Sequence, residues 1–324
     1  MNRFKNLLCV LDPWEPDAAL LERALALAGE NQATLTVAAV VDLGEEEGLL
    51  RRWFGLADPR AEVTRERTRF LEAFVAGRGE GPAPEVRVLT GRRYLEVIRE
   101  VIRGGRDLVL TLPGSPTWST RWMGSDELHL LRKCPCPVWL FRPRTQGFRN
   151  ILAALDLGPA SMGTETPEQG TLNQWVLELA ASLALSEFAQ LHLVHAYDAP
   201  GEALFRHHAL APSPEEQARY RSEVATRRSA ALGQVMERLR EHIGGEALDY
   251  LRPQARLLEG APAEAVPQYA QTHGVDLVVM GTVARTGIPG LIIGNTAETL
   301  LHRLECSVLA VKPPGFVSPV AAGA

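Results

Sequence analysis

The chain has 324 residues, of which 46% are hydrophobic and 23% are charged, values that are typical of globular proteins and exclude a wholly disordered chain. Its length predicts two domains. The formal charge of −5 gives no general attraction for nucleic acid or anionic lipid, and four cysteines are too few for a disulfide scaffold. No stretch approaches the roughly 20 apolar residues that cross a bilayer. We therefore expect a cytoplasmic protein without a membrane span.

The first half of the chain alternates predicted strands with predicted helices. A continuous apolar run at Leu7–Leu11 and a β-branched run at Thr34–Val41 are typical of strands that are buried on both faces. Apolar residues at helical spacing predict helices over Asp17–Gly29 and Asp58–Gly77. The later elements of this half are predicted as a strand at Val86–Leu89, a helix at Tyr94–Arg103, a strand at Leu108–Leu112, a helix around Leu128–Arg132 and a strand at Val138–Phe141.

The second half repeats this order. Residues 149–156 (RNILAALD) resemble residues 5–12 (KNLLCVLD), and residues 293–313 resemble residues 123–143. Strands are predicted near 150–155, 190–196, 254–258, 276–280 and 307–311, with a long charged helix within 213–243. Because the matches are colinear, we predict two homologous domains, over residues 1–145 and 146–315, and a flexible tail at 316–324. The alternation predicts the α/β class: two tandem doubly wound, Rossmann-like domains, each with a five-stranded, mainly parallel sheet.

Candidate ligand-binding residues follow the predicted strands. In open α/β sheets, ligands bind beyond the carboxyl ends of the strands. Asp12 and Asp156 close the first strand of each copy, and in the second copy Gly281 and Gly294 lie in the loop before Asn295-Thr296 opens a helix. Glycine lets the backbone approach a ligand, and free N–H groups at a helix start favour phosphate. Spacing alone leaves two alternatives open: a phosphate site, or an ordinary loop in which Asn295 is only the N-cap.

These residues resemble the universal stress protein family. Its nucleotide-binding members carry the pattern G-x2-G-x9-G-(S/T), and the second copy reads Gly281-x2-Ala284-x9-Gly294-Asn295. The stretch GTVARTGI…IGNTAE is particularly similar to the two-domain universal stress protein E group, and the resemblance covers about residues 3–314. It implies that Asp156 contacts the adenine or ribose of ATP, and that Gly281, Gly294, Asn295 and Thr296 approach the ribose and phosphates. Whether Mg²⁺ accompanies the ATP stays open.

Both copies depart from the family pattern. In the second copy, Ala284 replaces the middle glycine and Asn295 the Ser/Thr. Since the family contains members that bind ATP and members that do not, these departures leave ATP binding open. In the first copy, Gly114-x9-Gly124-Ser125 keeps the last two thirds of the pattern, but Thr111 stands where the first glycine would be. Trp118 and Trp122 are predicted to fill the nucleotide space there, so we predict that the second copy is the binding domain.

Several other polar groups are interpreted as structural. His192 and His195 are three residues apart on a strand, which places them on opposite faces and disfavours a shared metal. Cys136 and Cys306 recur at one position of both copies, which indicates packing. We therefore predict no metal site.

The charged runs and the loops after the second strands have simpler interpretations. Arg65–Arg69 and Arg219–Arg228 are predicted to be solvated helix faces, without the aromatic residues of a nucleic-acid groove. Arg51–Phe54 is predicted to lie in a mobile loop. A pocket for an apolar ligand between this loop and Ala203–Phe205 is a further hypothesis.

No catalytic motif such as G-x-S-x-G, G-x-x-x-x-G-K-[ST] or H-E-x-x-H is present, so we expect no enzyme. The leading hypothesis is a non-catalytic stress-response protein that binds an adenine nucleotide in its second domain and signals through protein partners. The alternatives are a nucleotide-independent protein that binds an apolar or lipid-like ligand or only protein partners, and a weak ATP hydrolase. The resemblance also implies that Val138–Phe141 and Val308–Val311 pair within one chain as a pseudo-dimer. Homodimerisation of the whole chain stays open.

Overall fold

The computed structural model describes residues 4–44, 46–55, 57–79, 82–113, 125–143, 147–158, 167–197, 212–282 and 294–322. The chain forms two compact units, called the first and the second domain below. Residues 316–322 belong to the first unit, although they follow the second in sequence. The flexibility of the tail, the limits of the domains and the pairing of their last strands stay predictions. No helix in the described part of the chain is long and apolar enough to cross a membrane.

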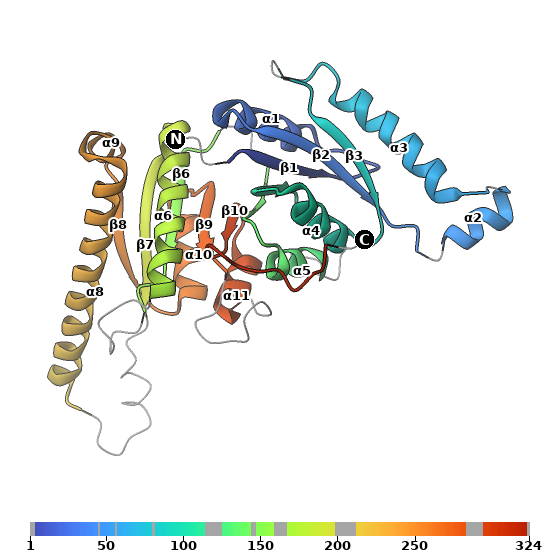
Figure 1. Cartoon of the computed structure of the whole chain (residues 1–324). Coiled ribbons are helices and arrows are strands. Elements are labelled where there is room, and N and C mark those ends of the chain that lie inside the picture. The colour runs from blue at the N-terminus through green and yellow to red at the C-terminus, as the bar shows by residue number, and fades with distance from the viewer. Residues whose placement is uncertain are drawn as a thin grey trace. The chain divides into compact units, whose positions relative to one another are not determined.

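The first domain contains a parallel sheet in the order β3-β2-β1-β4-β5 (Figure 1). The strands are β1 (Asn6–Leu11), β2 (Thr34–Val41), β3 (Glu85–Thr90), β4 (Leu108–Thr111) and β5 (Val138–Leu140). The helices are α1 (Ala18–Asn31), α2 (Glu46–Phe54), α3 (Pro59–Val75), α4 (Arg93–Gly104) and α5 (Ser125–Lys133). The central strands β1 and β4 are buried along almost their whole length, as continuous apolar runs require.

The ends of α1 show where the sequence-based helix limits hold and where they are wrong. Asp17 is the N-cap, and its side chain accepts a hydrogen bond of 2.7 Å from the N–H of Leu20. The helix does not stop at Gly29, because it continues to Asn31 and ends at Gln32 in the left-handed region with φ of 47°. The Gln32 N–H bonds the carbonyls of Ala28 and Gly29. A glycine near the end of a helix therefore does not stop it when the residues that follow still pack against the domain.

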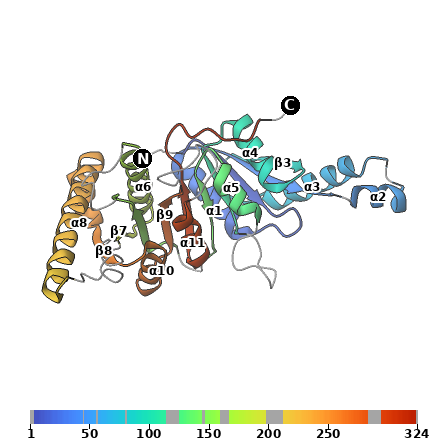
Figure 2. The same cartoon turned by 90° about the horizontal axis from the view of Figure 1, so that it is seen from below.

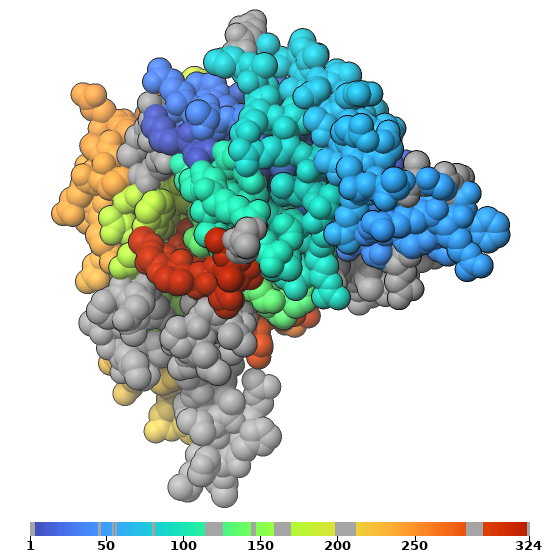
Figure 3. All heavy atoms as spheres, turned by 45° about the vertical axis from the view of Figure 1, so that its right-hand side comes forward, coloured from blue at the N-terminus to red at the C-terminus, as the bar shows by residue number. Residues whose placement is uncertain are grey.

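The segment Arg51–Phe54 is part of α2, so the prediction that it lies in a loop is wrong. Glu47 pairs with Arg51 one turn later, at 3.1 Å, and with Arg60 at the start of α3, at 2.5 Å. These pairs stabilise a short helix that has few buried residues. Both α2 and α3 are exposed at the surface in the view of Figure 3.

The second domain repeats the architecture in the order β10-β9-β6-β7-β8, again with parallel pairs. Its strands are β6 (Asn150–Leu155), β7 (Gln190–Tyr197), β8 (Gln254–Glu259), β9 (Leu277–Gly281) and β10 (Ser307–Val311). Its helices are α6 (Pro167–Ser186), α8 (Pro214–Ile243), α9 (Gly245–Leu251), α10 (Pro262–Thr272) and α11 (Asn295–Arg303). Right-handed crossovers place α6 and α8 on one side of the sheet and α10 and α11 on the other (Figure 2). The α/β, doubly wound fold is thus confirmed.

One repeated aspartate fixes the start of the first strand in each domain. Asp107 accepts hydrogen bonds from the backbone N–H groups of Lys5 and Asn6, at 2.6 and 3.0 Å. Asp276 accepts equivalent bonds from Arg149 and Asn150, at 2.8 and 2.9 Å. The recurrence of these aspartates therefore has a structural cause at the edge of the sheet away from the predicted ligand site.

Candidate functional site

Asp156 lies directly after β6 in a turn that three hydrogen bonds define. Asn173 of α6, which is 4% exposed, accepts a bond of 3.0 Å from the Asp156 N–H and donates one of 2.8 Å to its carbonyl. The Asp156 carboxylate in turn accepts the N–H of Gly158 at 3.1 Å, and Gly158 has φ of 74°. The left-handed conformation suits glycine. The predicted ligand residue is therefore held in place by the fold.

Gly281 ends β9, and the structure gives it a packing role. A Cβ atom at this position would lie 2.6 Å from Cδ2 of Leu172 on α6. Real Cβ atoms essentially never make so short a contact, so a side chain here would force Leu172 into another rotamer or shift α6. Glycine at this position is thus explained by the close approach of α6, whereas contact with a ligand stays a prediction.

The glycine loop of the second domain begins and ends at one place. Thr282 is 1% exposed, and its N–H bonds the carbonyl of Val311 on β10 at 3.1 Å. The N–H of Gly294 bonds the carbonyl of Thr282 at 3.3 Å, so the two ends of the loop lie side by side. Ala284 lies between them, outside the described residues.

The helix after this loop begins without a side-chain cap. Gly294 is the N-cap of α11, with no side-chain hydrogen bond, and Asn295 is the first helical residue. The suggestion that Asn295 is the N-cap is therefore wrong by one position. Asn295 and Thr296 are exposed. Their N–H groups, at the positive end of the helix dipole, suit an anion.

Asp12 of the first domain has a different set of partners. Its carboxylate accepts the N–H groups of Trp14 and Glu15, at 2.8 and 2.9 Å, in the turn after β1. Of the other predicted residues of this domain, Gly114 and Gly124 lie outside the described part of the chain, as do Trp118, Trp122 and the side chain of Ser125.

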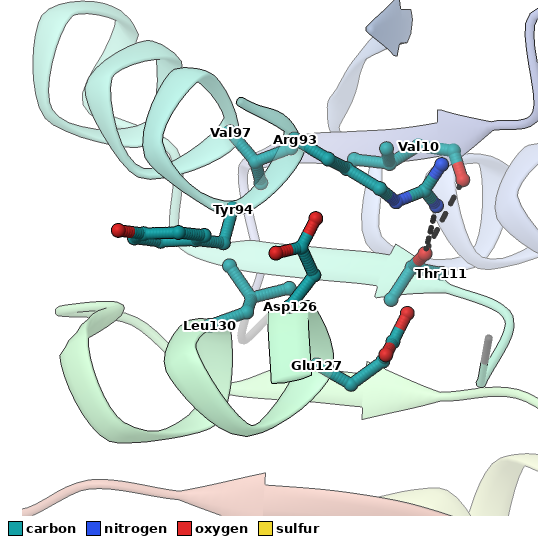
Figure 4. Close-up of a pocket in the computed structure, with 8 residues that line it drawn as sticks. All are labelled: Val10, Arg93, Tyr94, Val97, Thr111, Asp126, Glu127 and Leu130. Carbon is teal, nitrogen blue, oxygen red and sulfur yellow. Dashed lines mark hydrogen bonds between the residues drawn. The ribbon is translucent and has the colours of Figure 1, made fainter. Parts of the chain in front are cut away.

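A small pocket lies at the carboxyl end of the first sheet (Figure 4). Arg93, the first residue of α4, donates from Nη2 to Oγ1 of Thr111 at 2.9 Å. Asp126 and Glu127, in the first turn of α5, turn their carboxylates into the same space, and Glu127 is only 8% exposed. The pocket is completed by Val10, Tyr94, Val97 and Leu130. In the first domain, the helix start at which an anion would bind is thus occupied by two carboxylates and an arginine.

The second domain has neutral residues at all four positions. Gly91 and Gly260 end the third strand of each domain with the same backbone bond to the second strand, so Pro262 corresponds to Arg93. The strand registers against β1 and β6 make Met280 the counterpart of Thr111, and the final match of the two halves aligns Thr296-Ala297 with Asp126-Glu127. An anion at the start of α11 would therefore meet none of the charged side chains that occupy this place in the first domain.

The two strand histidines have separate structural partners. His192 is 3% exposed; its Nδ1 lies 3.0 Å from the hydroxyl of Tyr269, and its Nε2 lies 3.4 Å from Oδ1 of Asn150. Burial, followed by the charges of His273 and Arg256, lowers the pKa of His192 to about 4, so the ring is neutral near pH 7. His195 Nδ1 lies 3.0 Å from the carbonyl of Leu155. Within the described ranges, no three His, Cys, Asp or Glu residues gather as a metal site would require.

The cysteines and charged runs bear on two other interpretations. Cys136 and Cys306 are buried, as their recurrence predicted, and the hydrogen bond with Cys134, together with burial, raises the pKa of Cys136. Arg227 is exposed on α8, as a solvated face requires, but Arg228 is 6% exposed, so the prediction is wrong for that residue. The apolar-pocket hypothesis cannot be followed, since Ala203–Phe205 lie outside the described residues.

Sequence reasoning missed four residues of these sites. Asn173 occurs at helical spacing from the apolar residues Val176, Leu177 and Ala180, and Arg228 from Leu232 and Val235; a polar residue on an apolar helix face is a signal of a buried polar role. Arg93 and Glu127 gave no comparable signal, because charged residues are common at helix starts.

Comparison with known proteins decides the family. The model of the universal stress protein family matches residues 3–142 and again residues 147–312. The chain belongs to the universal stress protein family. Its two universal stress protein domains match universal stress protein E of Escherichia coli K12 at 28% identity, over 99% of this chain and 98% of the relative. The same protein of Photorhabdus laumondii is 29% identical, over 99% of both chains.

Solved structures agree on the fold. A universal stress protein from Archaeoglobus fulgidus covers 94% of this chain with a TM-score of 0.61 and 15% identity. A functionally unknown protein from Pseudomonas aeruginosa PAO1 covers 96% with a TM-score of 0.66 and 24% identity. The similarity spans both domains, so this chain shares the tandem arrangement of universal stress protein domains.

Proposed function

We propose that the second domain binds an adenine nucleotide and that the protein is a non-catalytic stress-response factor governed by this ligand. The observation that carries the proposal is the start of α11, where Gly294 caps the helix without a side-chain hydrogen bond, and where Asn295 and Thr296 are exposed residues whose N–H groups have no carbonyl partner within the helix. Such a helix start favours phosphate. The closed ends of the glycine loop hold it at the carboxyl edge of the sheet.

Asp156 supports the nucleotide assignment. It lies at the end of β6, next to β9, where the two halves of a doubly wound sheet diverge and where such folds bind ligands. Its turn is fixed by Asn173 and Gly158, so the carboxylate is held before a ligand arrives. A fixed carboxylate suits the hydroxyl groups of a ribose as hydrogen-bond donors.

The first domain supports the proposal by contrast. Its α5 start carries Asp126 and Glu127 where the second domain has Thr296 and Ala297. Two carboxylates at this place repel phosphate. We therefore assign the nucleotide to the second domain alone.

The test exchanges these residues between the domains. Nucleotide binding is measured by native mass spectrometry of the freshly purified protein and by calorimetric titration with ATP, with and without Mg²⁺. The double substitution Thr296→Asp with Ala297→Glu is expected to abolish ATP binding. It should not unfold the helix, because acidic residues stabilise a helix start. The matched control, Asp126→Thr with Glu127→Ala, should leave ATP binding unchanged.

Each outcome decides between the hypotheses. If the wild-type protein does not bind ATP, the proposal is wrong and a nucleotide-independent role is favoured. Release of inorganic phosphate from bound ATP, above that of the Thr296→Asp/Ala297→Glu variant, would favour the weak hydrolase. Signalling through protein partners and the cytoplasmic compartment stay predictions.

A further inference from the structure

Arg228 is a buried cation in the second domain. It lies on α8 with 6% of its surface exposed, and its Nη1 donates to the carbonyl of Leu157 at 3.3 Å. Its Nε is buried without a hydrogen-bond partner, and no carboxylate in the described part of the chain pairs with it. Burial lowers the pKa of Arg228, although an arginine remains charged at any physiological pH. A buried charge without a counter-charge is unfavourable and calls for an anion.

The first domain contains a matching arginine, Arg67 on α3. Its Nη1 donates to the carbonyl of Pro13 at 3.4 Å. Pro13 follows Asp12 as Leu157 follows Asp156, so both arginines bind the residue after the aspartate at the end of the first strand. The two helices also align around them, with valine four residues before and leucine four residues after each arginine.

Arg67 is fully engaged within its own domain. Its guanidinium carbon lies 4.6 Å from the ring centre of Trp14 and 5.0 Å from that of Phe70. It also forms a salt bridge with Glu66. Two aromatic faces and one carboxylate therefore satisfy this cation.

At the matching described positions of the second domain, Arg228 lacks all three of these partners. At matching positions, Gly158 replaces Trp14, Ala231 replaces Phe70 and Arg227 replaces Glu66. Arg227 itself pairs with Glu223 at 2.5 Å on the exposed side of α8. The second domain has thus removed two aromatic rings and reversed a charge around an arginine that it keeps buried.

We propose that Arg228 anchors an anion subsite beside Asp156, which receives a phosphate or carboxylate group of a small molecule. Nε and Nη2 provide the two-pronged donor geometry that such a group accepts. The inference deepens the proposed function, and rests on it, where the anion is a phosphate of the bound nucleotide. A separate small anion has the same chemistry, and the experiment distinguishes these two sources.

The subsite is tested first without nucleotide. The melting temperature of the full chain is measured in inorganic phosphate, citrate and chloride at matched ionic strength. We expect phosphate or citrate to raise it above the chloride value, and Arg228→Gln to remove the difference. Arg67→Gln, which loses the equivalent backbone bond in the first domain, should keep the difference. An equal response in all three salts, or a response that survives in Arg228→Gln, would overturn the proposal.

A second variant covers the case in which Arg228→Gln fails to fold. Ala231→Phe places a ring where Phe70 stands and keeps the charge, an arrangement that the first domain already accommodates. We expect it to fold and to lose the anion response. A folded Ala231→Phe protein with an unchanged response would contradict a subsite at this position.

Calorimetry with ATP and adenosine then identifies the source of the anion. If the nucleotide supplies it, Arg228→Gln should weaken ATP binding about 10-fold to 100-fold and leave adenosine binding unchanged. If a separate anion occupies the subsite, ATP affinity should be unchanged while the phosphate or citrate response is lost. A wild-type protein that binds no ATP but responds to phosphate or citrate would reject the proposed function and retain the subsite.

Discussion

The two domains share one backbone plan but fill equivalent positions with different chemistry. At the carboxyl edge, Arg93, Asp126 and Glu127 gather beside Thr111 in the first domain, where the second has neutral residues. At the opposite edge, Glu100 and Arg106 form a buried ion pair at 2.7 Å. The equivalent positions are Tyr269 and Val275, and Tyr269 bonds His192. Both domains therefore keep their volume filled and their buried polar groups bonded, whereas the placement of charge differs between them.

The largest effect is expected at the ion pair of the first domain. Glu100 and Arg106 have side chains that are 3% and 7% exposed, so Glu100→Gln leaves a buried cation without its main partner. We expect a loss of about 3–5 kcal/mol in the free energy of unfolding, measured with urea. The matched substitution in the second domain, Tyr269→Phe, removes one neutral hydrogen bond and should cost about 1 kcal/mol. Equal losses in the free energy of unfolding would show that the buried ion pair and the neutral hydrogen bond contribute similarly to stability.

Acid should lower the stability of the second domain more than that of the first at this edge of the sheet, because of His192. Since the pKa of His192 falls from 6.5 to about 4 on folding, the unfolded chain takes up the proton first. Its contribution to stability is complete above about pH 6.5 and is lost as the pH falls to about 4, a difference of about 3 kcal/mol. His192→Thr, which copies Thr36 of the first domain, should flatten the stability of the protein in this window relative to wild type. An unchanged slope in urea unfolding at pH 4 to 7 would contradict the assignment.

A smaller effect is expected from exchanging the residues that end the fourth strands. Gly281→Thr brings a Cβ to within 2.6 Å of the Leu172 side chain, so we expect a loss of about 1–3 kcal/mol. Adding Leu172→Ala should recover part of it, because space is then available. Thr111→Gly, at the end of β4, should not create a clash, and its cost should come from the lost bond to Arg93. A Gly281→Thr protein as stable as wild type would show that Leu172 or α6 gives way at little cost.

The smallest effect is expected at the turn that holds Asp156. Asn173→Ala removes two hydrogen bonds to the Asp156 backbone and should cost about 1–2 kcal/mol. It should also weaken nucleotide binding, since Asp156 is no longer fixed. Within the described residues, Asp12 of the first domain has no such amide partner, and Asp12→Ala is the control that should leave ATP affinity unchanged. If Asn173→Ala and Asp12→Ala bind ATP with similar affinity, Asp156 does not contact the ligand.

The strands and most helices follow from periodicity, because continuous apolar runs suit strands covered on both faces. Asp17 and Asp58 also start helices as N-caps, as their sequence positions indicate. Helix α2 was missed because it has no buried apolar stripe, and the ion pairs of Glu47 with Arg51 and Arg60 leave no periodic apolar pattern in the sequence. Asp12, Asp156, Gly294 and Thr296 were placed at the carboxyl edges by their order along the chain alone.

The sequence by itself determined the tandem repeat, the family and the edge of each sheet at which the candidate ligand residues lie, because these follow from local patterns and from the direction of parallel strands. The tertiary structure decided which charges meet there. Arg93 reaches Thr111, and Arg228 reaches Leu157, across many residues of chain. Whether such a side chain is solvated, paired or buried depends on which helix packs over it, and no local pattern records that.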